Sequence, residues 1–272
     1  MHSALSNAHT HTTHCDGKDS PETVARVAYE RGFVSLGFSS HAPQAFDRKY
    51  SVRDEAAYIA DIARLKREYR GRMRIWLGSE TDAYSAPTSG TYDYVIGAAH
   101  YIRVDGEQYT IDGSPERLDR YVRERFAGDG VELARRYYET LVGCARMHRP
   151  DIIAHFDLIR KYNADGRLFR PDDGRYRRIA LASMENVRKY SKIIEINTGA
   201  MTRGYMETPY PESFLLDAWR EMGGEIIINS DSHRADYLSN HYESAVLYAK
   251  RAGYATAYRL GSGYALFDRY VI

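Results

Sequence analysis

The chain has 272 residues and a net charge of +1, with 43% hydrophobic and 28% charged residues. These proportions are ordinary for a folded domain, and the length suits one large α/β domain better than two small ones. A charge so near zero provides no general positive field, which argues against a nucleic-acid partner and leaves room only for a local basic patch.

Neither the cysteines nor the amino-terminal segment indicates export. Cys15 and Cys144 are too few for a disulfide framework. Residues 1–7 lack the apolar stretch of a signal peptide, and no later run is long enough to cross a bilayer. We therefore expect a cytoplasmic protein with no membrane partner. The sequence carries no signal of its oligomeric state.

Seven short apolar runs predict β-strands. They lie at residues 8–12, 34–39, 74–78, 94–98, 152–155, 193–197 and 225–229. Several are continuous blocks of Val, Ile and Leu, which is typical of parallel strands that are buried on both faces.

Amphipathic segments between these runs predict helices. The first begins after Ser20 with proline at its first position and ends at Gly32. The others are expected at residues 54–69, 115–126, 130–147, 176–190, 212–222 and 242–251. The alternation of strands and helices predicts an α/β fold, either a parallel barrel or a doubly wound sheet.

Seven strands, with candidate ligands after nearly all of them, favour the barrel, because an open sheet gathers its ligands at one switch point. We treat residues 1–272 as a single domain. The connection from the fourth strand to the fifth is the longest and is broken at residues 128–130. Residues 105–149 are therefore a candidate helical insertion or lid.

Side chains that bind metal ions well follow six of the seven predicted strands. These candidates are His9, His11, Asp16, His41, Glu80, His100, His155, Asp231 and His233. The carboxyl ends of parallel strands gather on one side of a β/α fold, so we expect these residues to converge. Each alone would more often be a hydrogen-bonded histidine or a solvated carboxylate. Their shared position favours a multinuclear metal centre.

Three cations follow the fifth and sixth predicted strands. Arg160 and Lys161 come after His155, and Arg203 comes after the Asn197-Thr198-Gly199 sequence. Cations at the rim of a metal centre would suit a phosphate group, and a guanidinium offers two parallel hydrogen bonds. For Lys161 a solvated surface charge is an equal alternative. His14 either orients a ligand or faces the substrate.

The candidate ligands resemble those of the polymerase and histidinol phosphatase (PHP) superfamily, over nearly the whole chain. The matching motifs are His9-Thr10-His11…Asp16-Gly17, Ser39-Ser40-His41, Gly78-Ser79-Glu80, Gly97-Ala98-Ala99-His100, Ala154-His155 and Ser230-Asp231-Ser232-His233. The resemblance implies a distorted seven-stranded, TIM-like (β/α)7 barrel that holds three divalent ions. Nitrogen and oxygen ligands suit zinc, iron or manganese.

The resemblance also implies how the ligands are shared. The first ion would be bound by His9, His11, Glu80 and Asp231. Glu80 would bridge to a second ion, which His100 and His155 also bind. The third ion would be bound by Asp16, His41 and His233.

Further motifs resemble the histidinol-phosphatase branch of that superfamily. They are Ile96-Gly97-Ala98-Ala99-His100-Tyr101, His155-Phe156-Asp157-Leu158-Ile159-Arg160-Lys161, Glu195-Ile196-Asn197-Thr198-Gly199 and Tyr210-Pro211. One departure is Asp16-Gly17, since many relatives in this branch have a histidine-glycine element there. The substrate implied is a small phosphate ester, L-histidinol phosphate, which is cleaved to L-histidinol and phosphate in histidine biosynthesis.

In the mechanism implied, a hydroxide held between two ions attacks phosphorus in line, with Glu80, Asp231, His233 and Arg160 at the reacting group. Arg160, Arg203 and Lys161 would bind the phosphate. Tyr101, Asp157 and Tyr210 are candidates for contacts with the ammonium and imidazole of the substrate. One alternative is a phosphoesterase that acts on nucleotides, oligonucleotides or phosphotyrosine. Another is a non-catalytic metal-binding domain, against which the nine filled ligand positions argue.

Overall fold

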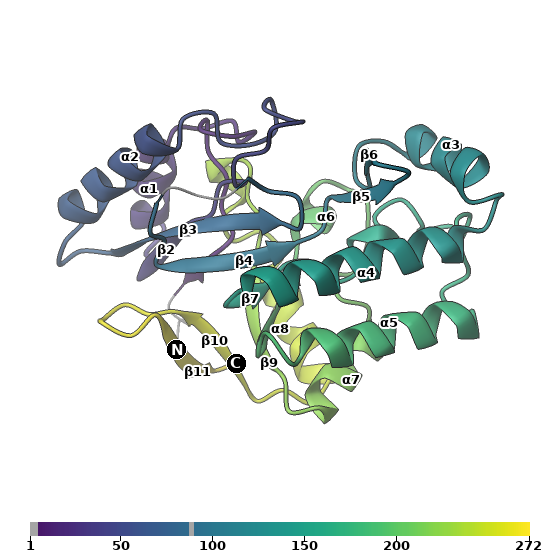
Figure 1. Cartoon of the computed structure of the whole chain (residues 1–272). Helices are drawn as coiled ribbons and strands as arrows, with labels where there is room; N and C mark the ends of the chain where they lie inside the picture. The colour runs from purple at the N-terminus through teal and green to yellow at the C-terminus, as the bar shows by residue number, and fades with distance from the viewer. Residues whose placement is uncertain (1–4, 87–89) are drawn as a thin grey trace.

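One curled sheet, surrounded by helices, forms the centre of the molecule in the computed structural model, which describes residues 5–86 and 90–272 (Figure 1). The start of the amino-terminal segment discussed above lies outside the described residues. In spatial order the strands are β1 (Ser6–Asn7), β2 (Ser35–Phe38), β3 (Arg74–Asp82), β4 (Tyr94–Ala98), β7 (Ile152–Ile153), β8 (Ile193–Asn197), β9 (Glu225–Asn229), β10 (Thr256–Leu260) and β11 (Phe267–Val271). Neighbouring strands are parallel except β10 and β11.

The prediction of seven strands was wrong, because the described sheet has nine. Strands β10 and β11 mix polar with apolar residues and are only partly buried, so they lack the continuous apolar run that marks the other strands. A parallel bridge between Thr10 and Ser232 brings the segment after β1 beside the segment after β9. The sheet therefore curls toward closure, in keeping with a PHP-type fold, without forming a complete TIM barrel.

A separate hairpin of β5 (Tyr101–Val104) and β6 (Glu107–Thr110) follows β4 and was not predicted. Its two-residue turn, Asp105-Gly106, has positive φ angles of 51° and 86°. An Asp-Gly pair is the usual sequence of such a turn, so the signal was present in the sequence. The hairpin extends beyond the carboxyl end of β4, next to the predicted ligand His100.

The helices lie close to their predicted positions. They are α1 (Pro21–Glu30), α2 (Glu55–Glu68), α3 (Pro115–Arg125), α4 (Gly130–His148), α5 (Gly174–Val187), α6 (Gly199–Thr202), α7 (Ser213–Glu221) and α8 (Tyr242–Arg251). Only the single turn α6 was not predicted. Caps define the starts: Ser20 Oγ accepts a hydrogen bond from Thr23 N, and Asp54 Oδ1 accepts one from Ala57 N. None of the described helices is both long and apolar enough to span a membrane.

Alternation along the strands divides the core into an inner and an outer part. On β3, Ile75 and Leu77 pack beneath α1 and α2, whereas Trp76 points to the other face. The cluster around Trp76 draws its residues from strands and the segments beside them and none from helices, so it fills the inside of the curl. Helices α4, α5, α7 and α8 cover the outer face on the β4–β9 side (Figure 1). The predicted ligands lie at the carboxyl end of the inner face.

Candidate metal centre

Glu80 lies at the middle of the candidate site. Strand β3 continues past its predicted end to Asp82, so Glu80 lies on the strand, on the same inner face as Trp76. Its Oε2 is 2.9 Å from His41 Nδ1 and 3.3 Å from His9 Nε2. Its Oε1 is 3.1 Å from His155 Nε2 and 3.5 Å from His100 Nε2. Oε2 also lies 3.5 Å from His11 Nε2, so the two carboxylate oxygens face five imidazoles in all.

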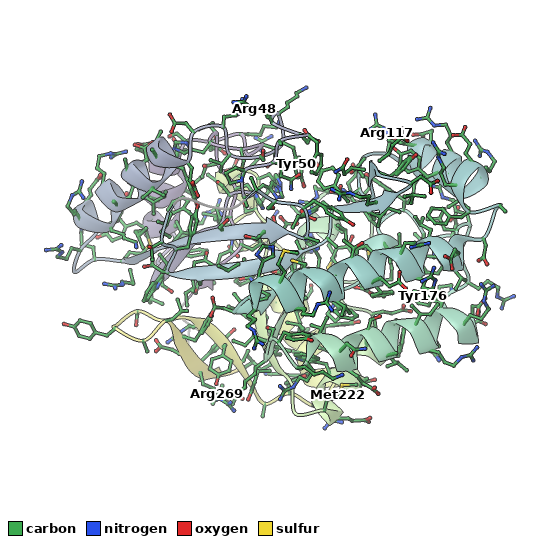
Figure 2. The ribbon with its side chains drawn as sticks, viewed as in Figure 1. Arg48, Tyr50, Arg117, Tyr176, Met222 and Arg269 are labelled. Carbon is green, nitrogen blue, oxygen red and sulfur yellow. The ribbon has the colours of Figure 1, made fainter. Side chains whose placement is uncertain are left out.

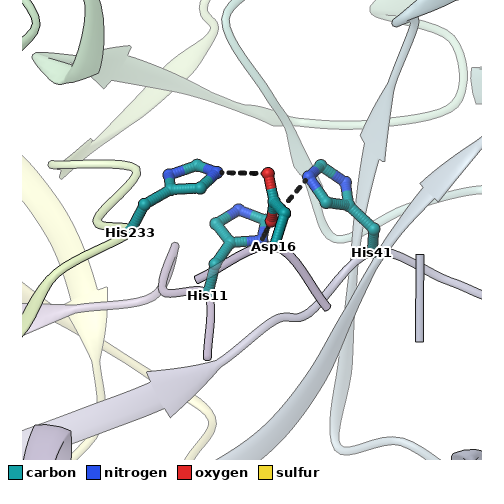
Figure 3. Close-up of side chains that lie close together, drawn as sticks. All are labelled: His11, Asp16, His41 and His233. Carbon is teal, nitrogen blue, oxygen red and sulfur yellow. Dashed lines mark ion pairs between the residues drawn. The ribbon is translucent and has the colours of Figure 1, made fainter. Parts of the chain in front are cut away.

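A second group surrounds Asp16 (Figure 3). His233 Nε2 is 3.2 Å from Asp16 Oδ2, and His41 Nε2 is 3.7 Å from Asp16 Oδ1. His11 Nδ1 lies 3.7 Å from the same Oδ1. The rings of His11 and His233 stack with 4.2 Å between their centroids. Residues from the first and last parts of the fold meet here because the segments after β1 and β9 lie side by side.

All nine predicted ligands come together in the described structure. Four groups have donor atoms within 4.8 Å of one another: His11, Asp16, His41 and His233; His9, Glu80 and His155; His9, His11 and Asp231; and His41, Glu80 and His100. The groups share members, so they form one continuous cluster. The convergence expected at the carboxyl ends of the strands is what the structure shows.

The cluster has the chemistry of a metal centre. Buried donor atoms without a hydrogen-bond partner among the described residues include His9 Nε2, His11 Nε2, Asp16 Oδ1, both ring nitrogens of His41 and Glu80 Oε2. Buried polar atoms are seldom left unpaired, because the loss of hydration is costly. Cations between these facing nitrogens and oxygens would satisfy them. The residues therefore fit divalent ions that accept mixed nitrogen and oxygen ligands.

The electrostatics of the cluster are dominated by burial and by opposed charges. Burial alone would raise the pKa of the Glu80 carboxyl, but His9, His100 and His41 outweigh it and hold the pKa well below its usual value. Burial also opposes the charged form of His100, yet the Glu80 and Asp82 carboxylates raise its pKa to about 10. Burial, aided by two neighbouring histidines, lowers the pKa of His11 to about 3. The carboxylates of the cluster are thus ionised near neutral pH.

A cavity of about 470 Å³ opens onto the cluster. Arg203 and Lys161, both predicted to bind phosphate, line it, together with Lys18 and Arg117. Arg203 Nη2 lies 3.0 Å from Asp231 Oδ2. A Cβ at position 199 would be 2.8 Å from Arg203 Nη2 and from Asp231 Oδ2, so a larger residue than Gly199 would displace these side chains. Arg117, labelled in Figure 2, comes from the start of α3.

Arg160, by contrast, does not line this cavity. Its Nε donates to Asp157 Oδ2 at 2.7 Å, and its Nη2 donates to the Pro209 carbonyl oxygen at 3.0 Å. Residues Leu158–Arg160 form a 3₁₀ turn, in which adjacent side chains point in different directions, so Lys161 faces the cavity and Arg160 does not. In this arrangement Arg160 is not part of the cavity lining, and its contact with a phosphate stays a prediction.

The three residues expected to contact the rest of the substrate are also separated. Tyr101 lines the cavity, whereas Asp157 and Tyr210 are fully buried and are not part of its lining, although the Tyr210 ring lies 6.2 Å from the His155 ring. Asp157 accepts hydrogen bonds from Arg160 and from Glu212 N. His14 is absent from the cavity wall, since its Nε2 lies 2.9 Å from Asp61 Oδ2 on α2.

Comparison with known proteins places the chain in a family. Residues 7–199 match the PHP domain. The protein belongs to the PHP domain family. It is 27% identical to a Schizosaccharomyces pombe protein named "Probable histidinol-phosphatase", over 91% of this chain and 86% of that one. It is 24% identical to the Bacillus subtilis histidinol-phosphatase, over 88% of this chain and 97% of that one.

A solved structure has a similar fold. It is the histidinol phosphate phosphatase of Lactococcus lactis, complexed with zinc, L-histidinol and phosphate. The TM-score is 0.71, and the match covers 94% of this chain and 97% of that chain at 19% identity. The resemblance to the histidinol-phosphatase branch, first noted from motifs, is thus confirmed by relatives over nearly the whole chain.

The PHP domain of this protein contains two buried carboxylates that were not among the predicted site residues. Glu195, on β8, is 3.0 Å and 3.1 Å from His9 Nδ1 through its two oxygens. Asp82 Oδ2 is 2.7 Å from His100 Nδ1. Each fixes a ring so that its Nε2 faces the cluster. The alternation of side chains between the two faces of a strand could have indicated both residues. Asp82 is two residues from Glu80 and so lies on the same face, and Glu195 lies between two isoleucines.

Proposed function

We propose that this protein is a cytoplasmic, metal-dependent phosphatase that hydrolyses L-histidinol phosphate to L-histidinol and phosphate. The observation that carries this proposal is the buried cluster of nine facing nitrogen and oxygen donors at the end of a cavity that cations line. The relatives named histidinol-phosphatase, which match nearly all of the chain, support the choice of substrate.

The cluster would hold three divalent ions. His9, His11, Glu80 and Asp231 would bind the first, Glu80, His100 and His155 the second, and Asp16, His41 and His233 the third. Zinc is favoured by the Lactococcus lactis protein, which was complexed with it, and iron and manganese suit the same donors. When bound, the ions would supply Lewis acidity and a water with a pKa lowered from about 16 toward roughly 7.

The residues of the chain would bind and orient the ester. Arg203 lies beside Asp231 at the cluster and can donate two hydrogen bonds to phosphoryl oxygens. Lys161, in the segment after β7, can add a point charge; its Nζ donates to the Asp112 carbonyl oxygen at 3.2 Å and lies 3.5 Å from Asp112 Oδ2. Both cations would neutralise charge that grows on the phosphoryl group in the transition state. We propose that α3, which brings Arg117 to the cavity, covers it as part of the segment 105–149.

The test is a phosphate-release screen on the purified protein with L-histidinol phosphate, adenosine monophosphate, phosphotyrosine and p-nitrophenyl phosphate. Activity should be highest on L-histidinol phosphate, disappear on chelation and return with added zinc or manganese. A marked preference for the nucleotide would replace the substrate proposed here. Inactivity of the fully metallated protein on every ester would support a non-catalytic metal-binding domain.

A further inference from the structure

The loop after His41 places an acidic and an aromatic residue over the metal cluster. Asp47 and Tyr50 both line the cavity. The Tyr50 ring stacks on the His41 ring with 4.0 Å between centroids and lies 5.8 Å from the His100 ring. Figure 2 labels Tyr50 below Arg48 of the same loop. The loop therefore forms a wall directly beside two candidate metal ligands.

The wall continues onto β5. The Tyr101 hydroxyl donates a hydrogen bond to Asp47 Oδ2 at 2.8 Å. Phe46 packs edge-on against the Tyr101 ring at 4.9 Å, and the Tyr50 ring lies 6.3 Å from it. The carboxylate of Asp47 is thus held in place at the cavity by a neutral donor, with two tyrosine rings next to it.

Asp47 differs from the other acids of the cavity in lacking a cation. Asp16 and Asp231 face histidines of the cluster, and Asp231 also pairs with Arg203. Asp112 pairs with Lys161. Within residues 5–86 and 90–272, by comparison, no lysine, arginine or histidine forms an ion pair with Asp47. The cavity therefore offers one carboxylate whose charge is not neutralised.

We propose that Asp47, flanked by Tyr50 and Tyr101, binds the positively charged part of an amine-bearing phosphate ester and so selects cationic esters over neutral ones. This inference rests on the proposed function, because it says which part of the same cavity binds the leaving group of the ester. Metal ions held by the cluster would bind the phosphate together with Arg203, and the ammonium or imidazolium group would extend toward the loop. There it would donate a charge-assisted hydrogen bond to Asp47 and lie beside the rings of Tyr50 and Tyr101.

Asp47, Tyr50 and Tyr101 line the cavity, whereas Asp157 and Tyr210, which the sequence also suggested for contacts with the substrate, are fully buried and are not part of its lining.

The test compares two esters of similar size that differ in charge, 2-aminoethyl phosphate and ethyl phosphate, alongside L-histidinol phosphate. The metallated wild type should prefer the cationic ester in kcat/KM. Asp47→Asn, which keeps the shape and removes the charge, should reduce that preference by about 10- to 100-fold, as expected for a hydrogen bond to a charged group. Its activity on ethyl phosphate should change little.

Asp105→Asn is the matched control, because Asp105 is exposed at the turn of the neighbouring hairpin and asparagine also tolerates its positive φ. It should leave the preference unchanged. Tyr101→Phe, which removes the donor that holds Asp47, should lower the preference by less than Asp47→Asn does. Equal metal content and thermal midpoint would show that the variants are folded.

Two results would overturn the inference in different ways. If the wild type prefers the cationic ester and Asp47→Asn keeps that preference, Asp47 is not the cation site although the proposed function stands. If the wild type shows no preference for the cationic ester, the cation site is rejected, and turnover of L-histidinol phosphate in the same assay decides separately whether the proposed function stands.

Discussion

Glu195→Gln should weaken metal binding although Glu195 belongs to none of the candidate ligand groups. Glu195 is fully buried, and its two oxygens accept from four donors: His9 Nδ1, His155 N, Asn197 Nδ2 and Asn229 Nδ2. The carboxylate holds the proton of His9 on Nδ1, which leaves Nε2 to face the cluster. Glutamine has only one accepting oxygen, so one of these donors must face an amide N–H.

The side-chain amides of the two neighbouring asparagines cannot flip to relieve this conflict. Asn197 Oδ1 accepts from Gly199 N at 2.8 Å, and Asn229 Oδ1 accepts from Ala8 N at 2.9 Å. A flip of either amide would break that bond. We therefore expect the metal-free variant to lose about 1–3 kcal/mol of unfolding free energy, the cost of leaving a buried donor unpaired. Metal affinity should fall by roughly 10- to 100-fold.

The assay is competition with a chromogenic chelator, followed by urea unfolding of the metal-free and the metallated protein. Glu185→Gln, an exposed change on α5, is the matched control and should alter neither quantity. If Glu195→Gln bound metal as tightly as this control, the claim that Glu195 orients His9 would be refuted, whatever its effect on unfolding.

Three further changes test other parts of the structure. Glu80→Gln should abolish turnover and reduce bound metal, because its oxygens face five imidazoles; metal analysis showing full occupancy would contradict this. Arg203→Ala should lower kcat/KM by about 100-fold. Arg160→Ala should leave metal content intact. It should destabilise the fold by about 3–5 kcal/mol, because the Asp157 carboxylate stays buried without the guanidinium. Activity and urea unfolding together separate these two arginines, and the reverse pattern would restore Arg160 to the phosphate. Gly143→Ala should stabilise α4 by about 0.5–1 kcal/mol in urea unfolding, because nothing lies within 4 Å of the added Cβ. A loss of stability would show that the added methyl group does not fit there.

Local patterns predicted most of the elements because burial in a β/α fold repeats along the chain. Strands β4, β8 and β9 coincide with their predicted ranges, since each is a compact apolar run with both faces covered. Strands β10 and β11 and the β5–β6 hairpin were missed, because partly exposed strands need no continuous apolar run.

The ligand set was predictable for a similar reason. A donor that directly follows a buried parallel strand has its position fixed by the strand, so order along the sequence translates into position in space. The orienting carboxylates Asp82 and Glu195 were missed because alternation along a strand indicates the face of a side chain but not its partner. Their role depends on which imidazole lies across the sheet, His100 or His9.

The sequence by itself therefore determined the alternation of strands and helices, the nine donors of the cluster and the family to which their motifs belong. Only the tertiary structure decided which charges face the cavity: Arg203 and Lys161 do, Arg160 does not, and Asp47 and Tyr50 enter from a loop with no recognisable motif. The physical reason is that periodicity assigns a side chain to a face of a helix or strand, whereas the direction of a side chain in a loop depends on contacts with distant segments.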